Sequence, residues 1–458
     1  MAYTTINKST DHFNTVTFTG NNSTQNITGV GFQPDLVWTK RRNGTTNHLL
    51  YDSVRGVGYY LFPNLTNAQG GNGTSALTAF NADGFTLNSS DDANTSGATG
   101  VGWSWKAGGT APSQTYVVKV VSDSGNKYRF DDFGTSAVTL DLQEGGVYTF
   151  DQSDSSNSGH PLRFSTTSNG THGGGTEYTT GVVVTGTPGN AGAKTVITVA
   201  ASAPTLYYYC TNHSGMGGQA NTNSTFGSSN FSGSVQSTVS ANTTSGFSIV
   251  KYTGNGSSGA TIGHGLGVAP EVVLVKKYSS GDPWTMLHPN VQASKYMRLD
   301  SDTGEVNDDV FNNTRAGNNV FTVDSDGQVN GNGNSFVAYC FKKKKGFFTT
   351  GEFIGNGNAD GPFLFCGFKP AFVIIKRKTA TKDWFMFDNK TSPRNPTNAY
   401  LRLNTNGAEG SYDWIDLVSN GIKIRNTSDG ANSNGNTYLF FAWGQSLVGS
   451  NNVPATAR

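Results

Sequence analysis

The sequence predicts an all-β protein made of several β-sandwiches, and three observations support that fold class. Among the 458 residues are 59 glycines, while aromatic residues make up 12% and charged residues only 14%. The apolar residues fall in short runs between turns rich in Gly, Asn and Ser, which is typical of all-β sandwiches. No stretch of about ten residues carries convincing helical periodicity. The chain is too long for one ordinary β domain and long enough for three or four.

One strand motif occurs three times in the chain. Each copy has a turn with a proline, a run of mostly apolar residues and then a basic pair, at residues 31–41, 267–277 and 367–377. A proline at the first position of a strand removes no hydrogen bond from the ladder. The apolar run that follows suits a strand that is buried on both faces or that lies at the core of a sandwich.

Further strand signals follow the motif in the same order in every copy. They lie at residues 48–52, 59–61, 85–87 and 101–105 in the first copy, at 284–288, 296–299, 321–323 and 336–341 in the second, and at 384–388, 400–403, 422–424 and 438–443 in the third. The separation between the proline and the closing aromatic residue is nearly constant, from Pro34 to Trp105, from Pro270 to Phe341 and from Pro370 to Trp443. A structural unit used three times explains this regularity.

We therefore expect three homologous, jelly-roll-like β-sandwich repeats, at residues 1–111, 244–345 and 346–446. Residues 223–243 are rich in Ser, Thr and Asn and are expected to form a linker. Residues 447–458 are expected to form a tail.

Residues 112–222 interrupt the repeat pattern and predict a fourth sandwich. Seven strand-like runs fit a Greek-key arrangement, at residues 115–121, 127–130, 138–142, 147–151, 162–165, 195–199 and 206–210. The last of these runs leads into a short loop that contains Cys210, His213 and Met216, and His160 lies upstream. One thiolate, two imidazoles and one thioether are the ligands of a mononuclear type 1 copper centre.

This stretch resembles the cupredoxins, the small blue-copper proteins of the plastocyanin and amicyanin group. The resemblance implies a cupredoxin-like Greek-key sandwich in which His160, Cys210, His213 and Met216 are the candidate copper ligands. Two interpretations stay open, since the four side chains could hold copper or serve only for packing and for hydrogen bonds that tie the loops together. His172, in a Gly-rich loop, is expected to be a solvated histidine and not a ligand.

The chain as a whole resembles virion structural proteins of tailed bacteriophages that infect marine bacteria, including cyanophages. The resemblance rests on Gly-Phe-x-Pro-Asp-Leu-Val-Trp-x-Lys at residues 31–40 and on the Tyr-Tyr-Tyr-Cys-x-Asn-His-Ser-Gly-Met-Gly-Gly string at residues 207–218. It implies a virion component, either a surface fibre or adhesin-type protein for host attachment (a tail-fibre-like role) or a capsid decoration protein such as a head fibre or cement protein. A copper-binding electron carrier is a third hypothesis, from a different class.

Charge and composition limit the expected partners and location. The net charge of +1 gives no electrostatic reason to expect nucleic acid or anionic membrane as a partner, and no run approaches the roughly 18 apolar residues of a membrane span. The first residues carry no secretory pattern, and three cysteines are too few for a disulfide framework. We expect a homo-oligomer that is assembled in the host cytoplasm with other virion proteins, is released by lysis and contacts a host-surface glycan or receptor.

Catalytic motifs give no support for an enzyme, and none is expected. Paired aspartates fall in turns rich in Gly, Asn and Ser, where aspartate is favoured for backbone reasons. Most of the seven tryptophans recur between the copies and are expected in the core. Trp414 has no counterpart in the other copies and is the candidate contact for a glycan or partner.

Overall fold

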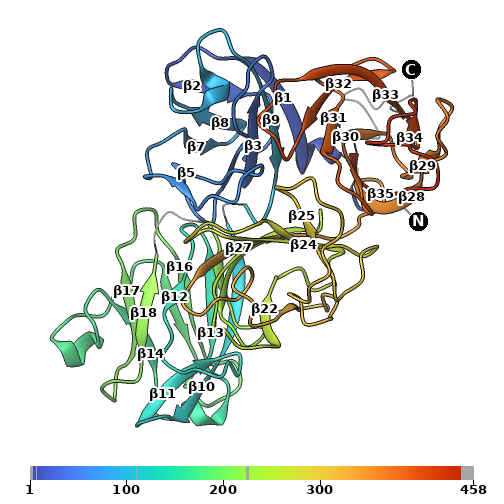
Figure 1. Cartoon of the computed structure of the whole chain (residues 1–458). Coiled ribbons are helices and arrows are strands. Elements are labelled where there is room, and N and C mark those ends of the chain that lie inside the picture. The colour runs from blue at the N-terminus through green and yellow to red at the C-terminus, as the bar shows by residue number, and fades with distance from the viewer. Residues whose placement is uncertain (1–3, 7, 110, 223–225, 445–458) are drawn as a thin grey trace.

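The computed structural model describes residues 4–6, 8–109, 111–222 and 226–444 (Figure 1). Its regular elements are β-strands and a few short 3-10 helices, so the all-β expectation is confirmed. Among the described residues no helix is long and apolar enough to cross a membrane. The expected tail at residues 447–458 lies outside the described residues.

The first repeat consists of two sheets. Its main sheet has the order β1 (Phe13–Thr19), β9 (Thr99–Trp105), β3 (Leu36–Arg41), β4 (Leu49–Asp52). The second sheet has the order β2 (Gln25–Thr28), β8 (Gly84–Leu87), β7 (Leu77–Asn81), and a short pair is formed by β5 (Tyr59–Tyr60) and β6 (Gly70–Gly71).

The other two repeats follow the same strand order. In the second, β21 (Phe247–Thr253), β27 (Ser335–Phe341), β23 (Val272–Lys277), β24 (Thr285–Leu287) and β25 (Met297–Arg298) are consecutive in the main sheet, and β22 (Ala260–Gly263) pairs with β26 (Val320–Val323). In the third, a single sheet has the order β28 (Phe348–Ile354), β35 (Thr437–Gly444), β30 (Pro370–Arg377), β31 (Trp384–Asp388), β32 (Thr397–Arg402), β33 (Gly410–Val418), β34 (Gly421–Ile424), β29 (Phe363–Phe365).

Each main sheet is buried on both faces. In β3, Leu36 and Trp38 point into one apolar cluster while Val37 between them belongs to another. The same alternation occurs in β30, where Phe372 and Ile374 lie in the first cluster. Because successive side chains of a strand point to opposite faces, a sheet covered on both sides needs a continuous apolar run. This explains the apolar run of the repeated motif.

The cluster shared by all three repeats forms the centre of the molecule. It contains residues of the three main sheets and surrounds an apolar cavity of about 60 Å³. Its tryptophans are 7% exposed or less, at positions Trp38, Trp103, Trp105, Trp284, Trp384 and Trp443. The expectation that the recurrent tryptophans pack in the core is therefore confirmed.

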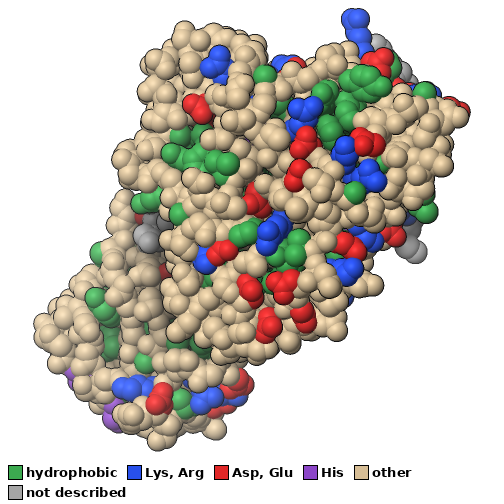
Figure 2. Space-filling model, viewed as in Figure 1, with side chains coloured by type: hydrophobic (Ala, Val, Ile, Leu, Met, Phe, Trp, Pro, Cys, Tyr) green, Lys and Arg blue, Asp and Glu red, His purple; other side chains and the backbone are tan. Residues whose placement is uncertain are grey.

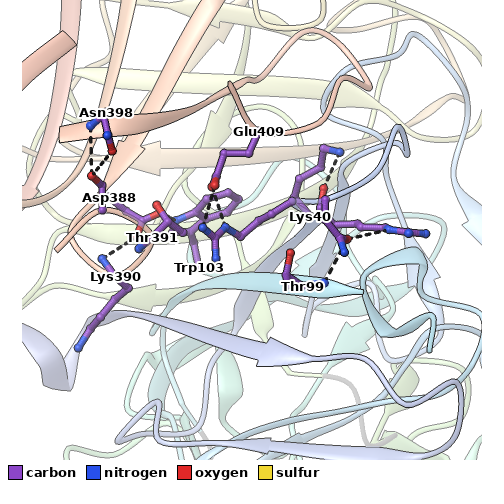
Figure 3. Close-up of polar contacts among 12 residues, drawn as sticks. Lys40, Thr99, Trp103, Asp388, Lys390, Thr391, Asn398 and Glu409 are labelled. Carbon is purple, nitrogen blue, oxygen red and sulfur yellow. Dashed lines mark hydrogen bonds and ion pairs between the residues drawn. The ribbon is translucent and has the colours of Figure 1, made fainter. Parts of the chain in front are cut away.

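Contacts at equivalent positions of the three repeats form a closed cycle around this core. Trp103 of the first repeat donates to Asp388 Oδ2 of the third (3.2 Å), as Figure 3 shows. At the equivalent positions, Tyr339 of the second repeat donates to Asp52 Oδ2 of the first (2.7 Å), and the ring of Phe441 in the third lies 5.1 Å from that of His288 in the second. Each repeat thus contacts the next one through equivalent residues, as in a ring with approximate three-fold symmetry.

The first lysine of each basic pair takes part in the same cycle. These lysines are 1% exposed or less, and each donates to a backbone carbonyl of a neighbouring repeat: Lys40 to Asn406, Lys276 to Thr66 and Lys376 to Asp302. Burial lowers the pKa of each ammonium group to about 8. The carbonyl oxygens offset part of the cost of burying the charge.

Residues 112–222 fold as a sandwich of two mixed sheets. One has the order β11 (Asn126–Phe130), β10 (Ser113–Ser122), β13 (Val147–Asp151), β16 (Lys194–Thr198), β15 (Val182–Thr185), and the other β12 (Leu140–Asp141), β18 (Gly218–Asn221), β17 (Leu206–Cys210), β14 (Leu162–Ser165). All seven expected strands are present, and β15 and β18 are added to them. Figure 1 shows this inserted sandwich projecting from the second repeat.

The stretch expected to be a linker, residues 223–243, differs from that expectation over its described part. It contains β19 (Ser228–Asn230) and β20 (Ser237–Asn242), a hairpin at the edge of the second repeat's main sheet. Between them, Phe231 is 5% exposed in the core of the inserted sandwich, and Tyr116 donates to the carbonyl of Ser229 (2.9 Å). Ser-rich and Thr-rich composition is typical of a solvated linker, but here the hydroxyl groups of Ser228 and Ser229 bond across the junction to Tyr148 and to the amide N–H of Asp141.

Replacing Arg55 by Met tests the buried ion pair that holds Asp52, the residue that accepts from Tyr339 of the second repeat. The Arg55 and Asp52 side chains are 1% and 0% exposed, with Nε and Oδ2 2.5 Å apart. Loss of the cation would leave a buried carboxylate without its ion pair, so we expect the free energy of unfolding to fall by about 3 to 5 kcal/mol. Urea denaturation measures the change.

Lys8 provides the matched control for this prediction. It forms an exposed ion pair with Asp11, with side chains 60% and 49% exposed, and Lys8→Met should change stability by less than about 1 kcal/mol. Equal urea midpoints for the two variants would contradict a structural role for the Arg55–Asp52 pair.

Candidate metal centre

Strand pairing brings the upstream histidine to the cysteine loop. β14 and β17 are antiparallel neighbours in which Leu162 pairs with Cys210. His160 lies two residues before Leu162, so it reaches the end of β17 where Cys210 is placed. The chain then turns through His213 and Met216 and returns as β18. His160, Cys210 and His213 therefore meet at one end of one sheet, and Met216 follows in the same loop.

The two imidazoles converge on the thiol through the same ring atom. Cys210 Sγ lies 3.6 Å from His213 Nδ1 and 3.9 Å from His160 Nδ1, and the two rings are 4.5 Å apart. A metal ion with bonds of about 2.0 Å to nitrogen and 2.3 Å to sulfur holds such atoms roughly 3.5 Å apart in tetrahedral geometry. The spacing of the donor atoms fits one small ion.

The four candidate ligands differ in exposure. Cys210 is 0% and Met216 1% exposed, and both belong to the apolar core of the inserted sandwich. His160 is half-buried and His213 is exposed. Burial and the neighbouring His213 lower the pKa of His160, which favours the neutral imidazole that a metal requires. Figure 2 shows histidine side chains at the surface of the insert, at the end away from the repeats.

Hydrogen bonds from outside the ligand set fix both loops. Tyr128 Oη and Gln152 Nε2 donate to the carbonyl of His160 (2.9 and 2.8 Å). The amide N–H of Tyr128 donates to the carbonyl of Met216 (3.0 Å). Partners of this kind orient ligands before a metal binds.

His172 was expected to be a solvated histidine, and its side chain is exposed. Its Nε2–H also donates to the carbonyl of Cys210 (3.1 Å) from a short 3-10 helix, Gly170–Gly173. The group of converging donor atoms contains His160, Cys210 and His213 and not His172. His172 therefore supports the cysteine loop from outside, a role that the sequence did not indicate.

Trp414, the candidate glycan or partner contact, is far from this centre in the fold. It lies on β33 in the core of the third repeat and is 4% exposed. Its ring is 4.4 Å from that of Phe385, and its indole N–H has no hydrogen-bond partner among the described residues. The side chain that reaches solvent beside it is Tyr412, which is 50% exposed.

Comparison with known proteins gives one match. The model of a family described as a domain of unknown function, DUF7483, matches residues 8–127 and 219–446. No curated protein and no solved structure matches. The matched segments cover the three repeats and leave out residues 128–218, which carry all four candidate ligands. Because the match extends over most of the sequence, the chain belongs to the DUF7483 family.

Proposed function

We propose that this protein is a structural component of a bacteriophage particle, a surface fibre or adhesin-type protein that serves host attachment. The observation that carries the proposal is the closed cycle of contacts among the three repeats. The resemblance of residues 31–40 and 207–218 to marine phage particle proteins supplies the biological setting. Other virion proteins are then its partners, and the virion is its location.

The ring suits such a role for a physical reason. Three sheets buried on both faces share one dense core, and densely packed interiors deform little. The loops and the inserted sandwich are held on the outside of this rigid centre (Figure 1). Binding surfaces are commonly built from loops on a rigid scaffold. A capsid decoration protein would need the same properties and is the alternative within this proposal.

A second candidate function rests on the donor atoms around Cys210. A Cys and two His ligands with a nearby Met suit copper, which would supply one-electron chemistry when bound. His160, Cys210 and His213 would hold the ion, and Met216, buried in the same loop, is a candidate fourth ligand. Because His213 is exposed, a bound ion would be within reach of a redox partner from that side.

Immunogold labelling of intact phage particles tests the virion proposal. Antibodies against the full chain should label fibres or the tail tip if it is an adhesin. Regular labelling of the head would identify the decoration alternative. Particles that carry no label, although the lysate contains the protein, would refute a virion role.

Titration of the purified protein with Cu(II) tests the metal centre. One equivalent should produce an intense visible thiolate-to-copper absorption band, because Cys210 lies between two imidazole nitrogens. Cys210→Ser should abolish the band. Cys366→Ser, a half-buried cysteine of the third repeat, is the matched control and should retain it. A wild-type spectrum without the band, or a band that survives Cys210→Ser, would contradict the assignment.

A further inference from the structure

The third repeat contains a pocket beside Trp414. It measures about 490 Å³ and lies over β32 and β33. Small-molecule sites typically enclose about 300 to 1,000 Å³. Figure 2 shows hydrophobic side chains gathered over this part of the molecule, with acidic and basic side chains beside them.

The two sheets of the sandwich are joined at this pocket. β32 pairs with β33 in the third repeat, with an irregular register between Thr397 and Ala399. In the first two repeats the main sheet and the smaller sheet remain separate. Irregular pairing bends a strand and redirects its side chains. Tyr400 and Arg402, two residues apart on β32, line the same pocket as Tyr412 and Trp414 of β33.

The floor of the pocket is aromatic. The rings of Phe385, Tyr400 and Tyr412 surround Trp414, with centroids 4.4, 5.3 and 5.7 Å from it. Gly430 leaves room for this packing, since a Cβ atom there would lie 2.6 Å from Phe385. Phe385 and Trp414 are buried and support the floor, while Tyr412 offers a ring that is half exposed.

The rim of the pocket carries two ion pairs of balanced charge. Lys382 Nζ lies 2.7 Å from Asp429 Oδ2, and Arg402 Nε lies 3.1 Å from Asp383 Oδ2. The Asp429 and Arg402 side chains are 52% and 45% exposed, so both still face water. An anionic or cationic ligand would have to compete with these internal partners. A neutral ligand with many hydroxyl groups can donate to the carboxylates and accept from the cations.

From these features we infer that the pocket binds a neutral pyranose sugar, such as a terminal residue of a glycan. The apolar C–H face of the ring packs on Tyr412, and the hydroxyl groups bond to the rim. This inference deepens the proposed function and rests on it for its biological meaning, because it names the ligand class of a host-attachment surface. The glycan contact expected of Trp414 is thus assigned to its exposed neighbour Tyr412, and the buried ring of Trp414 supports that of Tyr412.

Saturation-transfer NMR on the full-length protein tests the inference. The probes are the methyl glycosides of glucose, galactose, mannose and N-acetylglucosamine at millimolar concentration, and choline chloride. At least one glycoside should receive saturation, and Tyr412→Ala should weaken its binding about tenfold, as expected for loss of one aromatic contact. Asp429→Asn should weaken it as well.

Phe365→Ala supplies the matched control. Phe365 is a 68% exposed aromatic residue of the same repeat that does not line the pocket, so its loss should leave binding unchanged. Thermal melting of all variants checks that they are folded. Absence of transfer to every glycoside, transfer to choline alone, or unchanged binding in Tyr412→Ala would overturn the inference.

The sugar-binding test and the virion proposal can fail independently of each other. A protein found on the particle that binds none of the sugars would refute only the sugar site. A protein that binds a sugar through Tyr412 but is absent from the particle would refute only the virion role.

Discussion

The structure depends on the packing of three sheets against one apolar core. Each main sheet contributes one face to its own sandwich and the other to the shared centre. Burial of that second face is favourable in proportion to the apolar area removed from water. None of the three sheets could leave the cycle without exposing an apolar face that includes tryptophan and phenylalanine. The central packing therefore couples the stability of all three repeats.

Hydrogen bonds between the repeats fix how the three sheets are oriented against one another. A buried donor or acceptor without a partner is costly, so each contact between repeats specifies a single arrangement. The indole N–H of Trp284 donates to the carbonyl of Phe62 (2.8 Å), and that of Trp384 to the carbonyl of Arg298 (3.0 Å). His48 takes the equivalent position in the first repeat and donates to Arg402 (3.1 Å). A histidine replaces a tryptophan here, and the hydrogen bond is kept because both rings carry an N–H.

The rigid centre allows the outer parts to differ. The inserted sandwich is attached through the β19–β20 hairpin, where the Ser229 carbonyl accepts from Tyr116 Oη and the Ser229 hydroxyl accepts from the amide N–H of Asp141, and it carries the candidate metal centre. The third repeat joins its two sheets, and the pocket beside Tyr412 lies over the strands that join them. Neither change touches the shared core. Both candidate sites thus lie where variation costs the ring little stability.

Much of the architecture could be predicted from residues close in sequence. Alternation and turn residues are local properties, so the strands of the three repeats and of the insert were legible, and so was the grouping of Cys210, His213 and Met216 in one loop. The β19–β20 hairpin was missed because its partners, such as Tyr116, are distant in sequence. The basic pair was visible in every copy, but nothing local indicated that its first lysine would be buried against another repeat.

By itself, the sequence determined that the chain is all-β, that one unit is used three times and which side chains are available to bind a metal. Only the tertiary structure decided that the repeats close into a ring, that His160 meets Cys210 and that Tyr412, and not Trp414, faces solvent. The physical reason is the distance along the sequence over which each kind of interaction acts. Backbone propensity and side-chain alternation act over a few residues, whereas burial and hydrogen-bond pairing depend on which distant surfaces meet.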